Sequence, residues 1–194
     1  MITFWIPESV VPVDDNLFLE LCRNNPDNRI ERTQKGEIKI MSPTGGETGK
    51  WNFKVYYHFQ TWNKSRKIGI FFDSSTAFRL SNSAIRSPDL AFLRLDRWNS
   101  LSQAEKETFP PICPDFVLEI RSKSDSLKDA QSKMQEWIEN GCKLAWLFDL
   151  ENFVYYTYRP EKELEVKSGK DVVLYGEDVL NGFEFSMAEF LEEE

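Results

Sequence analysis

The feature that most constrains the fold is a strand–helix–strand pattern across residues 115–150. Residues 115–122 (DFVLEIRS) and 143–150 (KLAWLFDL) are short apolar runs typical of buried strands. Between them, residues 125–141 have an apolar stripe at helical spacing, with Ser124 or Asp125 as a suitable cap and Gly141 as its end. Because strands joined by a crossover helix run parallel, we expect a βαβ unit in a mixed sheet.

The rest of the chain alternates between helical and strand-like segments, without a repeat or a flexible linker. We therefore expect one α/β domain over residues 1–194, with helices flanking a mixed central sheet and a β-meander toward the C-terminus. The predicted helices are 13–25, about 20 residues following a turn at 43–50, and a short acidic helix near the end. The predicted strands are 28–33 and 36–42 as a hairpin, 69–75, 76–81, 87–93, and 152–159, 163–169 and 171–176 as the meander.

Composition restricts the classes of function. The net charge is −8 and the pI about 4.9, whereas proteins that grip duplex DNA mainly through phosphate contacts are usually basic. Tight non-specific binding to nucleic acid is therefore disfavoured. A local basic groove, or an acidic site that needs a metal ion before it approaches phosphate, remains compatible with this charge.

Several other classes find no support in the sequence. Cys22, Cys113 and Cys142 are few, odd in number and widely spaced, which fits neither a disulfide framework nor a zinc site. The single histidine, His58, does not make a histidine metal site by itself. We recognise no signal peptide and no apolar run long enough to cross a membrane, so we expect a cytoplasmic protein.

The strand 115–122 contains a carboxylate that needs an explanation. Its side chains alternate, so Val117, Glu119 and Arg121 share one face. If helices cover both faces of the sheet, Glu119 is partly buried, and a buried carboxylate requires a cation, a metal ion or a proton. An ion pair with Arg121, or with a lysine on a neighbouring element, would satisfy it without any catalytic role.

Three further residues favour a site around Glu119. Asp89 begins an apolar strand after Pro88, and two carboxylates on neighbouring strands form an oxygen site suited to Mg²⁺ or Mn²⁺. Lys133 lies in the helix that packs on the strand of Glu119, and Glu31 lies in the hairpin strand 28–33. The simpler interpretations are a turn cap for Asp89, a surface lysine for Lys133 and a solvated charge for Glu31.

Five blocks of the chain together resemble the Uma2 (DUF820) family, whose members are described as endonucleases of the PD-(D/E)xK, restriction-endonuclease-like superfamily. The blocks are RIERTQKGEIKIMSPTGGETG, RSPDLAFL, PDFVLEIRSKSD, KMQEWIENGCKLAWLFD and YRP, and they follow the order of the family. The resemblance extends over roughly residues 14 to 190. It implies a restriction-endonuclease-like fold and metal-dependent hydrolysis of DNA phosphodiester bonds.

The resemblance also assigns roles to single residues. Asp89 matches the aspartate of the PD motif, Glu119 matches the acid of (D/E)xK, and Glu31 matches an acid that such folds place in their first core element. Arg121 departs from the family by replacing the motif lysine. Arginine stays charged and cannot deprotonate a water molecule, so Lys133 is a candidate for a lysine supplied from the helix instead.

The mechanism implied by the resemblance uses a metal ion, with Asp89, Glu119 and the carbonyl of Ile120 holding Mg²⁺ or Mn²⁺. Lys133, or else Arg121, would orient water or stabilise the transition state. A homodimer is expected by analogy, because cutting both strands takes two active sites. The alternative is a catalytically inactive module on the same fold that binds nucleic acid, regulates a partner or dimerises.

Overall fold

The structure, a computed structural model, describes residues 2–4, 13–41, 43–123 and 125–192 of the chain. In this part, six strands form a central sheet in the order β11-β10-β9-β8-β7-β4. β8 and β9 run parallel and the other neighbouring strands run antiparallel, which confirms the predicted mixed sheet and its βαβ unit. The elements of this unit and their neighbours are β4 (Gly69–Asp73), β7 (Leu90–Arg94), β8 (Phe116–Ile120), α5 (Leu127–Glu139), β9 (Leu144–Asp149), β10 (Val154–Tyr158) and β11 (Glu165–Ser168).

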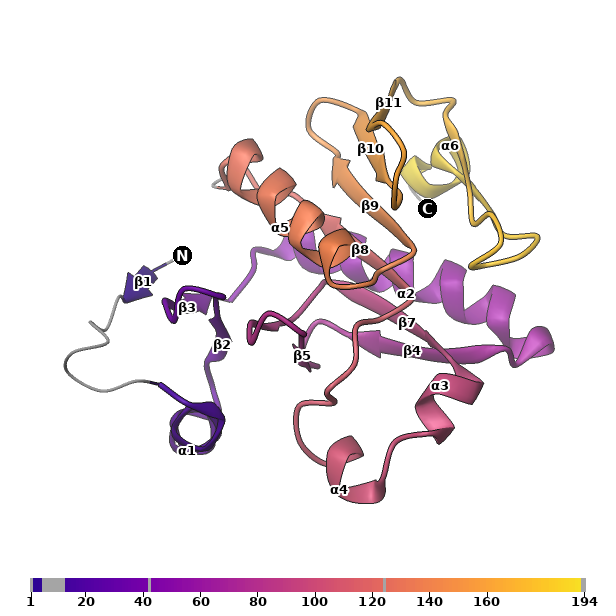
Figure 1. Cartoon of the computed structure of the whole chain (residues 1–194). Coiled ribbons are helices and arrows are strands. Elements are labelled where there is room, and N and C mark those ends of the chain that lie inside the picture. Colours follow the sequence, from indigo (N-terminus) through magenta and orange to yellow (C-terminus); the bar gives the residue numbers. More distant parts are fainter. Residues whose placement is uncertain (1, 5–12, 42, 124, 193–194) are drawn as a thin grey trace.

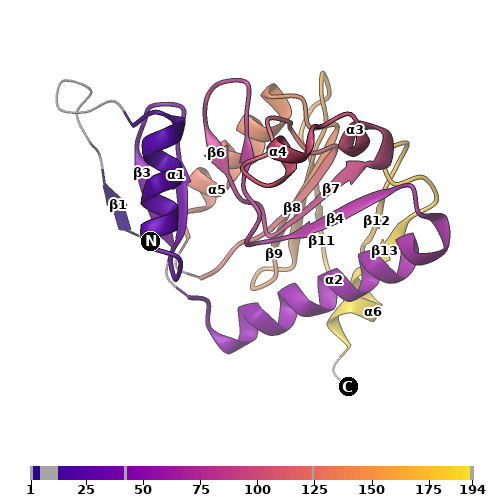
Figure 2. The same ribbon diagram turned by 90° about the horizontal axis from the view of Figure 1, so that it is seen from below.

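Different helices cover the two faces of the central sheet. The long helix α2 (Gly46–Arg66) lies across one face and α5 across the other (Figures 1 and 2). Phe116, Leu118 and Ile120 of β8 belong to the core on the α2 side, whereas Val117 belongs to the core on the α5 side. Since successive strand residues point to opposite faces, Glu119 points to the same side as Val117, toward α5.

A second sheet that the sequence did not predict lies beside the central one (Figure 1). Over the described residues its order is β1-β3-β2-β6-β5. The predicted hairpin is present as β2 and β3, but it pairs onward with β6 and not with the central sheet. Phe18 of the helix α1 is fully buried against it, beside Ile30 and Ile38. The elements are β1 (Ile2–Phe4), α1 (Asp15–Asn24), β2 (Arg29–Arg32), β3 (Ile38–Met41), β5 (Phe78–Arg79) and β6 (Ile85–Arg86).

The C-terminal strands differ from the predicted meander. β10 and β11 form a hairpin on the edge of the central sheet, as expected. The third predicted strand does not continue it: β12 (Val173–Tyr175) pairs with β13 (Glu184–Ser186) in a separate two-stranded sheet. This sheet and α6 (Met187–Leu191) pack beside α2 (Figure 2), and Phe183, Phe185 and Phe190 extend the core there. β12 therefore belongs to a separate sheet and not to the hairpin.

The helix that brings Lys133 to the sheet begins slightly later than predicted. Its N-cap is Ser126, whose hydroxyl oxygen accepts from the amide of Asp129. Asp125 instead accepts from the amide of Ser122 at 3.2 Å, and Ser124 lies outside the described residues. Gly141 follows the helix with φ +109°, a left-handed conformation that favours glycine, in agreement with the predicted helix end.

Two short helices, α3 (Leu95–Asn99) and α4 (Gln103–Lys106), complete the connection between β7 and β8. Among the helices of the described ranges, none is long and apolar enough to cross a membrane.

Candidate active site

A cavity of about 550 Å³ opens between the end of β8, α5 and the second sheet. Its lining includes the first turn of α2 and the loop that leads from β8 to α5. Ten of the lining residues described are charged, and they balance at five basic and five acidic. They are Arg29, Lys39, Arg86, Arg121 and Lys133, and Glu31, Asp89, Glu119, Asp125 and Asp129. The cavity is therefore much less negative than the chain, whose net charge is −8.

Glu119 is the acid of the cavity whose pKa is raised. Its side chain is only 14% exposed, and Oε1 lies 2.7 Å from Nζ of Lys133. Beyond this ion pair, the buried Oε1 has no hydrogen bond within the described part of the chain. Burial, with the negative charges of Asp89 and Glu31, raises the pKa of Glu119 to about 7, although Lys133 opposes this rise.

Lys133 reaches inward from α5 and joins the two sheets. Its ammonium group donates to Oε1 of Glu31 at 2.9 Å and to the carbonyl of Ser87 at 2.8 Å, besides its ion pair with Glu119. Burial alone would lower its pKa, but Glu119 and Glu31 outweigh burial and raise the pKa of Lys133. The lysine is therefore held as a cation between a residue of the second sheet and a residue of the central sheet.

Glu31 is fixed by cations and by a backbone amide. Lys133 binds Oε1, the guanidinium of Arg86 lies 3.1 Å from Oε2, and the amide of Ser87 donates to Oε1 at 2.9 Å. Burial opposes its ionisation, but the two cations and these hydrogen bonds lower the pKa of Glu31 to about 2. Arg86 also pairs with Glu136 of α5 at 2.6 Å, so a chain of alternating charges crosses the interface between the sheets.

Asp89 lies at the start of β7, beside the end of β8. Its Oδ2 accepts from the amide of Ile120 at 2.8 Å, and its Oδ1 lies 3.5 Å from the guanidinium of Arg29. The hydroxyl of Tyr56 on α2 donates to the backbone carbonyl of Asp89 at 2.6 Å. The structure thus places the Asp89 carboxylate next to the backbone that follows Glu119, on the wall of the same cavity.

Arg121, at the position of the motif lysine, makes different contacts. Its guanidinium pairs with Asp149 at 2.6 Å and donates to the carbonyl of Asp125 at 3.1 Å. It lines the cavity but holds the end of β9 to the loop before α5. The cation that the structure places against Glu119 is Lys133.

Arg29 and Arg86 line the cavity but were not among the candidate residues predicted from the sequence. Arg29 shares a strand face with Glu31, two residues away, and Arg86 stands three residues before Asp89, so their proximity to candidate acids was a usable signal. The role of Ser87 could not be predicted from the pattern of side chains. It acts through its backbone, whose carbonyl accepts from both Lys133 and Arg29.

The donor set of the cavity fits a hard divalent cation. No group of three or more His, Cys, Asp or Glu side chains in the described ranges is arranged to hold a metal ion. Two carboxylates, Asp89 and Glu119, are present with the backbone of Ile120, and Mg²⁺ commonly uses one or two carboxylates with waters and substrate phosphates. The Glu119 carboxylate is paired only with Lys133 among the described cations, and a carboxylate oxygen is the kind of ligand that such an ion binds.

His58 and the cysteines lie apart from this site. The His58 ring packs against Phe185 and Phe190, and burial lowers its pKa. Cys22, Cys113 and Cys142 are free thiols, and burial raises the pKa of each. These residues have packing roles.

Comparisons with known proteins agree with the resemblance inferred from the sequence. The family model Uma2, described as "Putative restriction endonuclease", matches residues 15–188. The chain is similar to the crystal structure of a "putative nuclease belonging to DUF820" from Anabaena variabilis, with a TM-score of 0.73 and 17% identity over 84% of this chain and 90% of that one. A search of curated proteins finds no match. At that identity the structural likeness establishes the fold, and the family model establishes that the chain belongs to the Uma2 family.

Proposed function

We propose that this protein is a metal-dependent endonuclease that hydrolyses phosphodiester bonds of DNA. The observation that carries the proposal is that Asp89 and Glu119 line one cavity and that Lys133 forms an ion pair with Glu119. Membership in the Uma2 family, whose model is described as a restriction endonuclease, supports this function. The balanced charge of the cavity supports it as well, because a neutral wall repels a phosphate backbone less than the chain's overall charge would.

Asp89 and Glu119, with the carbonyl of Ile120, are the proposed ligands of Mg²⁺ or Mn²⁺. When bound, such an ion supplies charge stabilisation to the phosphate and acidifies water. Glu119 must lose its proton to act as a ligand, and its pKa of about 7 places that loss near neutral pH. The hydrogen bond from the amide of Ile120 keeps the Asp89 carboxylate against β8, which orients it before any ion arrives.

Lys133 and Arg29 are the proposed cations of the reaction. Lys133 carries a positive charge at the Glu119 carboxylate and is held there by Glu31 and the Ser87 carbonyl. We assign it the role of stabilising charge on the phosphate or orienting water, the role that the motif lysine would have. Arg29 faces Asp89 and lines the cavity with a partly exposed side chain, so we assign its guanidinium as a donor for a phosphate oxygen.

The test is cleavage of supercoiled plasmid and of single-stranded DNA with Mg²⁺ or Mn²⁺. We expect wild type to cut at least one substrate, and Asp89→Asn and Glu119→Gln each to lower the rate at least about 100-fold. Glu20→Gln, at an exposed glutamate on α1, is the matched control and should leave the rate unchanged. Equal rates for wild type and Glu119→Gln would refute the assignment.

The second candidate is a catalytically inactive module that binds nucleic acid or dimerises. One observation favours it: Lys133 already occupies Glu119, so the acids of the site are charge-paired without a metal ion. This candidate predicts binding without cleavage under every metal condition. Sedimentation of the wild-type chain, with and without DNA, tests the homodimer that either function could use.

A further inference from the structure

The second helix has two very different sides. Val55, Phe59 and Asn63 are buried against the central sheet. On the opposite side, Phe53 is 74% exposed and Tyr57 is 65% exposed, which makes them the most exposed large hydrophobic side chains among the described residues. Residues four apart on a helix lie one above the other, so the two rings project from the same side of α2.

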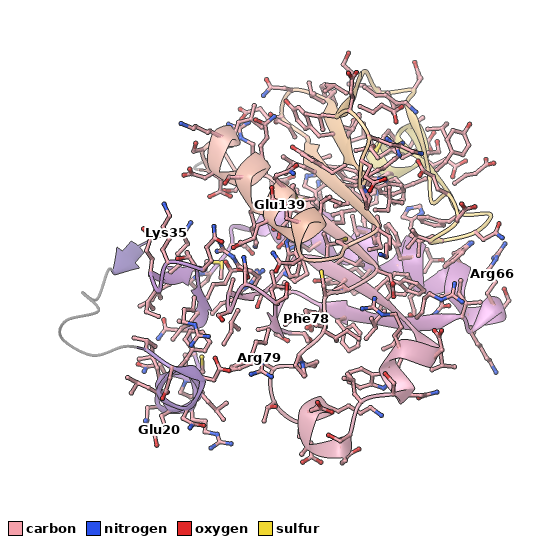
Figure 3. The ribbon with its side chains drawn as sticks, in the orientation of Figure 1. Glu20, Lys35, Arg66, Phe78, Arg79 and Glu139 are labelled. Carbon is pink, nitrogen blue, oxygen red and sulfur yellow. The ribbon has the colours of Figure 1, made fainter. Side chains whose placement is uncertain are left out.

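Basic residues flank this aromatic pair. Lys50 lies one turn before Phe53, and Lys64 lies two turns after Tyr57, both exposed. We call Lys50, Phe53, Tyr57 and Lys64 the α2 stripe. The helix as a whole carries four basic residues and one acidic residue, a net charge of +3, although the chain carries −8. Arg66, which is labelled in Figure 3, is the last residue of α2, and the first turn of the helix lies at the other end.

The α2 stripe starts near the candidate active site along the helix axis but lies on a different side of the helix. Thr44, Gly45 and Thr48, at the start of α2, line the cavity that contains Asp89 and Glu119. From Thr48 to Phe53 the helix rises by about 7.5 Å, at 1.5 Å per residue. Because Thr48 and Phe53 also lie about 140° apart around the helix, at about 100° per residue, a strand leaving the cavity has to pass around α2 to reach the two rings.

We propose that the α2 stripe binds unpaired bases of a nucleic-acid strand, with Phe53 and Tyr57 stacking on the bases and the lysines near the phosphates. The identity of this strand rests on the proposed nuclease function. Exposed rings flanked by lysines are the combination that binds single strands, because base faces are open to stacking there and closed within a duplex.

Charge favours a nucleic acid over a second copy of the chain as the occupant. Pairing two copies through this helix would bring a net charge of +3 against another +3. A polyanion is attracted by the same charge. The α2 stripe would therefore favour substrates with a single-stranded segment, such as a flap, an overhang or a melted site.

Fluorescence anisotropy with a labelled oligothymidylate of about 20 nucleotides tests this, with EDTA present to prevent cleavage. A duplex of the same length is the comparison probe. We expect the variant Phe53→Ala/Tyr57→Ala to lose at least about tenfold in affinity for the single strand, and much less for the duplex. Tyr175→Ala is the matched control, because that ring is 52% exposed on β12, away from the α2 stripe.

Unchanged affinity of the double variant for the single strand, or no single-strand binding by wild type, would overturn the inference. An equal loss on both probes would also overturn it, because stacking on unpaired bases affects the single strand selectively. A wild-type dimer that becomes a monomer in the double variant, with single-strand affinity unchanged, would assign the stripe to a second copy instead.

The two proposals fail separately. Cleavage by wild type without any effect of the double variant on binding would remove the stripe and leave the nuclease. Loss of single-strand binding in the double variant, with no cleavage under any metal condition, would keep the stripe and remove the nuclease. Glu20→Gln should bind the oligothymidylate like wild type, since this exposed glutamate lies on α1, outside both the cavity and the stripe.

Discussion

The two faces of strand β8 differ in the forces that hold them. On the α2 face, Phe116 and Leu118 pack into a continuous aromatic and aliphatic core. On the α5 face, Val117 packs into an apolar cluster, and Glu119, two residues later, belongs to a set of buried charges that includes Lys133. One face is stabilised by apolar area and close packing, which is not directional, and the other by charge pairs, which fail if one partner is lost.

The difference shows how a small fold combines stability with chemistry. The α2 face holds the sheet rigid, and so fixes the backbone from which Glu119 and the Ile120 amide project. The α5 face then carries charges that would be costly in an isolated position. Variants that act on one face and not on the other separate these two contributions.

The largest expected effect on stability is on the apolar face. Phe59 is fully buried and contacts the rings of Phe116, Trp146 and Phe183. We expect Phe59→Ala to lower the free energy of unfolding by about 3–5 kcal/mol, measured by urea denaturation. Phe59→Leu should cost less because it leaves a smaller cavity. A loss that varied strongly between pH 3 and pH 7 would contradict a purely apolar origin.

On the charged face, Arg86→Met leaves two buried carboxylates, Glu31 and Glu136, without this shared cation. We expect a loss of about 3 kcal/mol in the free energy of unfolding, because breaking a buried pair leaves an uncompensated charge. The triple variant Arg86→Met/Glu31→Gln/Glu136→Gln should recover most of it. A triple variant less stable than Arg86→Met would contradict this explanation, because it would show that the loss does not come from the two uncompensated carboxylates.

The pH dependence of Glu31 sharpens the same comparison. Its pKa is lowered to about 2 in the folded chain, so its ion pairs stabilise the fold above the ordinary pKa of a glutamate, and that stability is lost as pH falls toward 2. Glu31→Gln should therefore cost up to about 3 kcal/mol at pH 7. The difference from wild type should shrink between about pH 4.5 and pH 2, where wild type loses its advantage.

Thermal or urea denaturation across that pH range measures the effect. Glu20→Gln, at the exposed glutamate used above, is the control and should follow wild type at every pH. A constant difference between Glu31→Gln and wild type would mean that the Glu31 carboxylate is not preferentially ionised in the folded state.

The smallest expected effect concerns Arg121. A lysine there keeps a charge near Asp149 but loses the planar contact that also reaches the Asp125 carbonyl. We expect Arg121→Lys to cost about 1 kcal/mol of stability and to change cleavage only about twofold.

The comparison variant for cleavage is Lys133→Met, which should lower the cleavage rate by about 100-fold or more. If Arg121→Lys lowered the cleavage rate more than Lys133→Met, the role of catalytic cation would belong to Arg121.

Much of the fold follows from local patterns. The alternation in 115–122, the helical stripe before Gly141 and the hairpin at 28–42 each predict their own element, because side-chain burial and turn chemistry act over a few residues. The separate β12–β13 sheet did not follow, since the strand-like pattern of 171–176 does not say which partner it pairs with. That pairing depends on distant rings such as Phe183 and Phe185.

The candidate site divides in the same way. Local residue patterns are enough to predict that Glu119 is a strand carboxylate in need of a partner, that Asp89 begins another strand, and that Lys133 lies on the covering helix. The packing of distant elements is needed to see that Lys133 pairs with Glu119 while Arg121 pairs with Asp149. The same holds for Arg86, which binds Glu31 and Glu136. Periodicity fixes the face on which a side chain lies, but the partner of a buried charge depends on which distant element packs against that face.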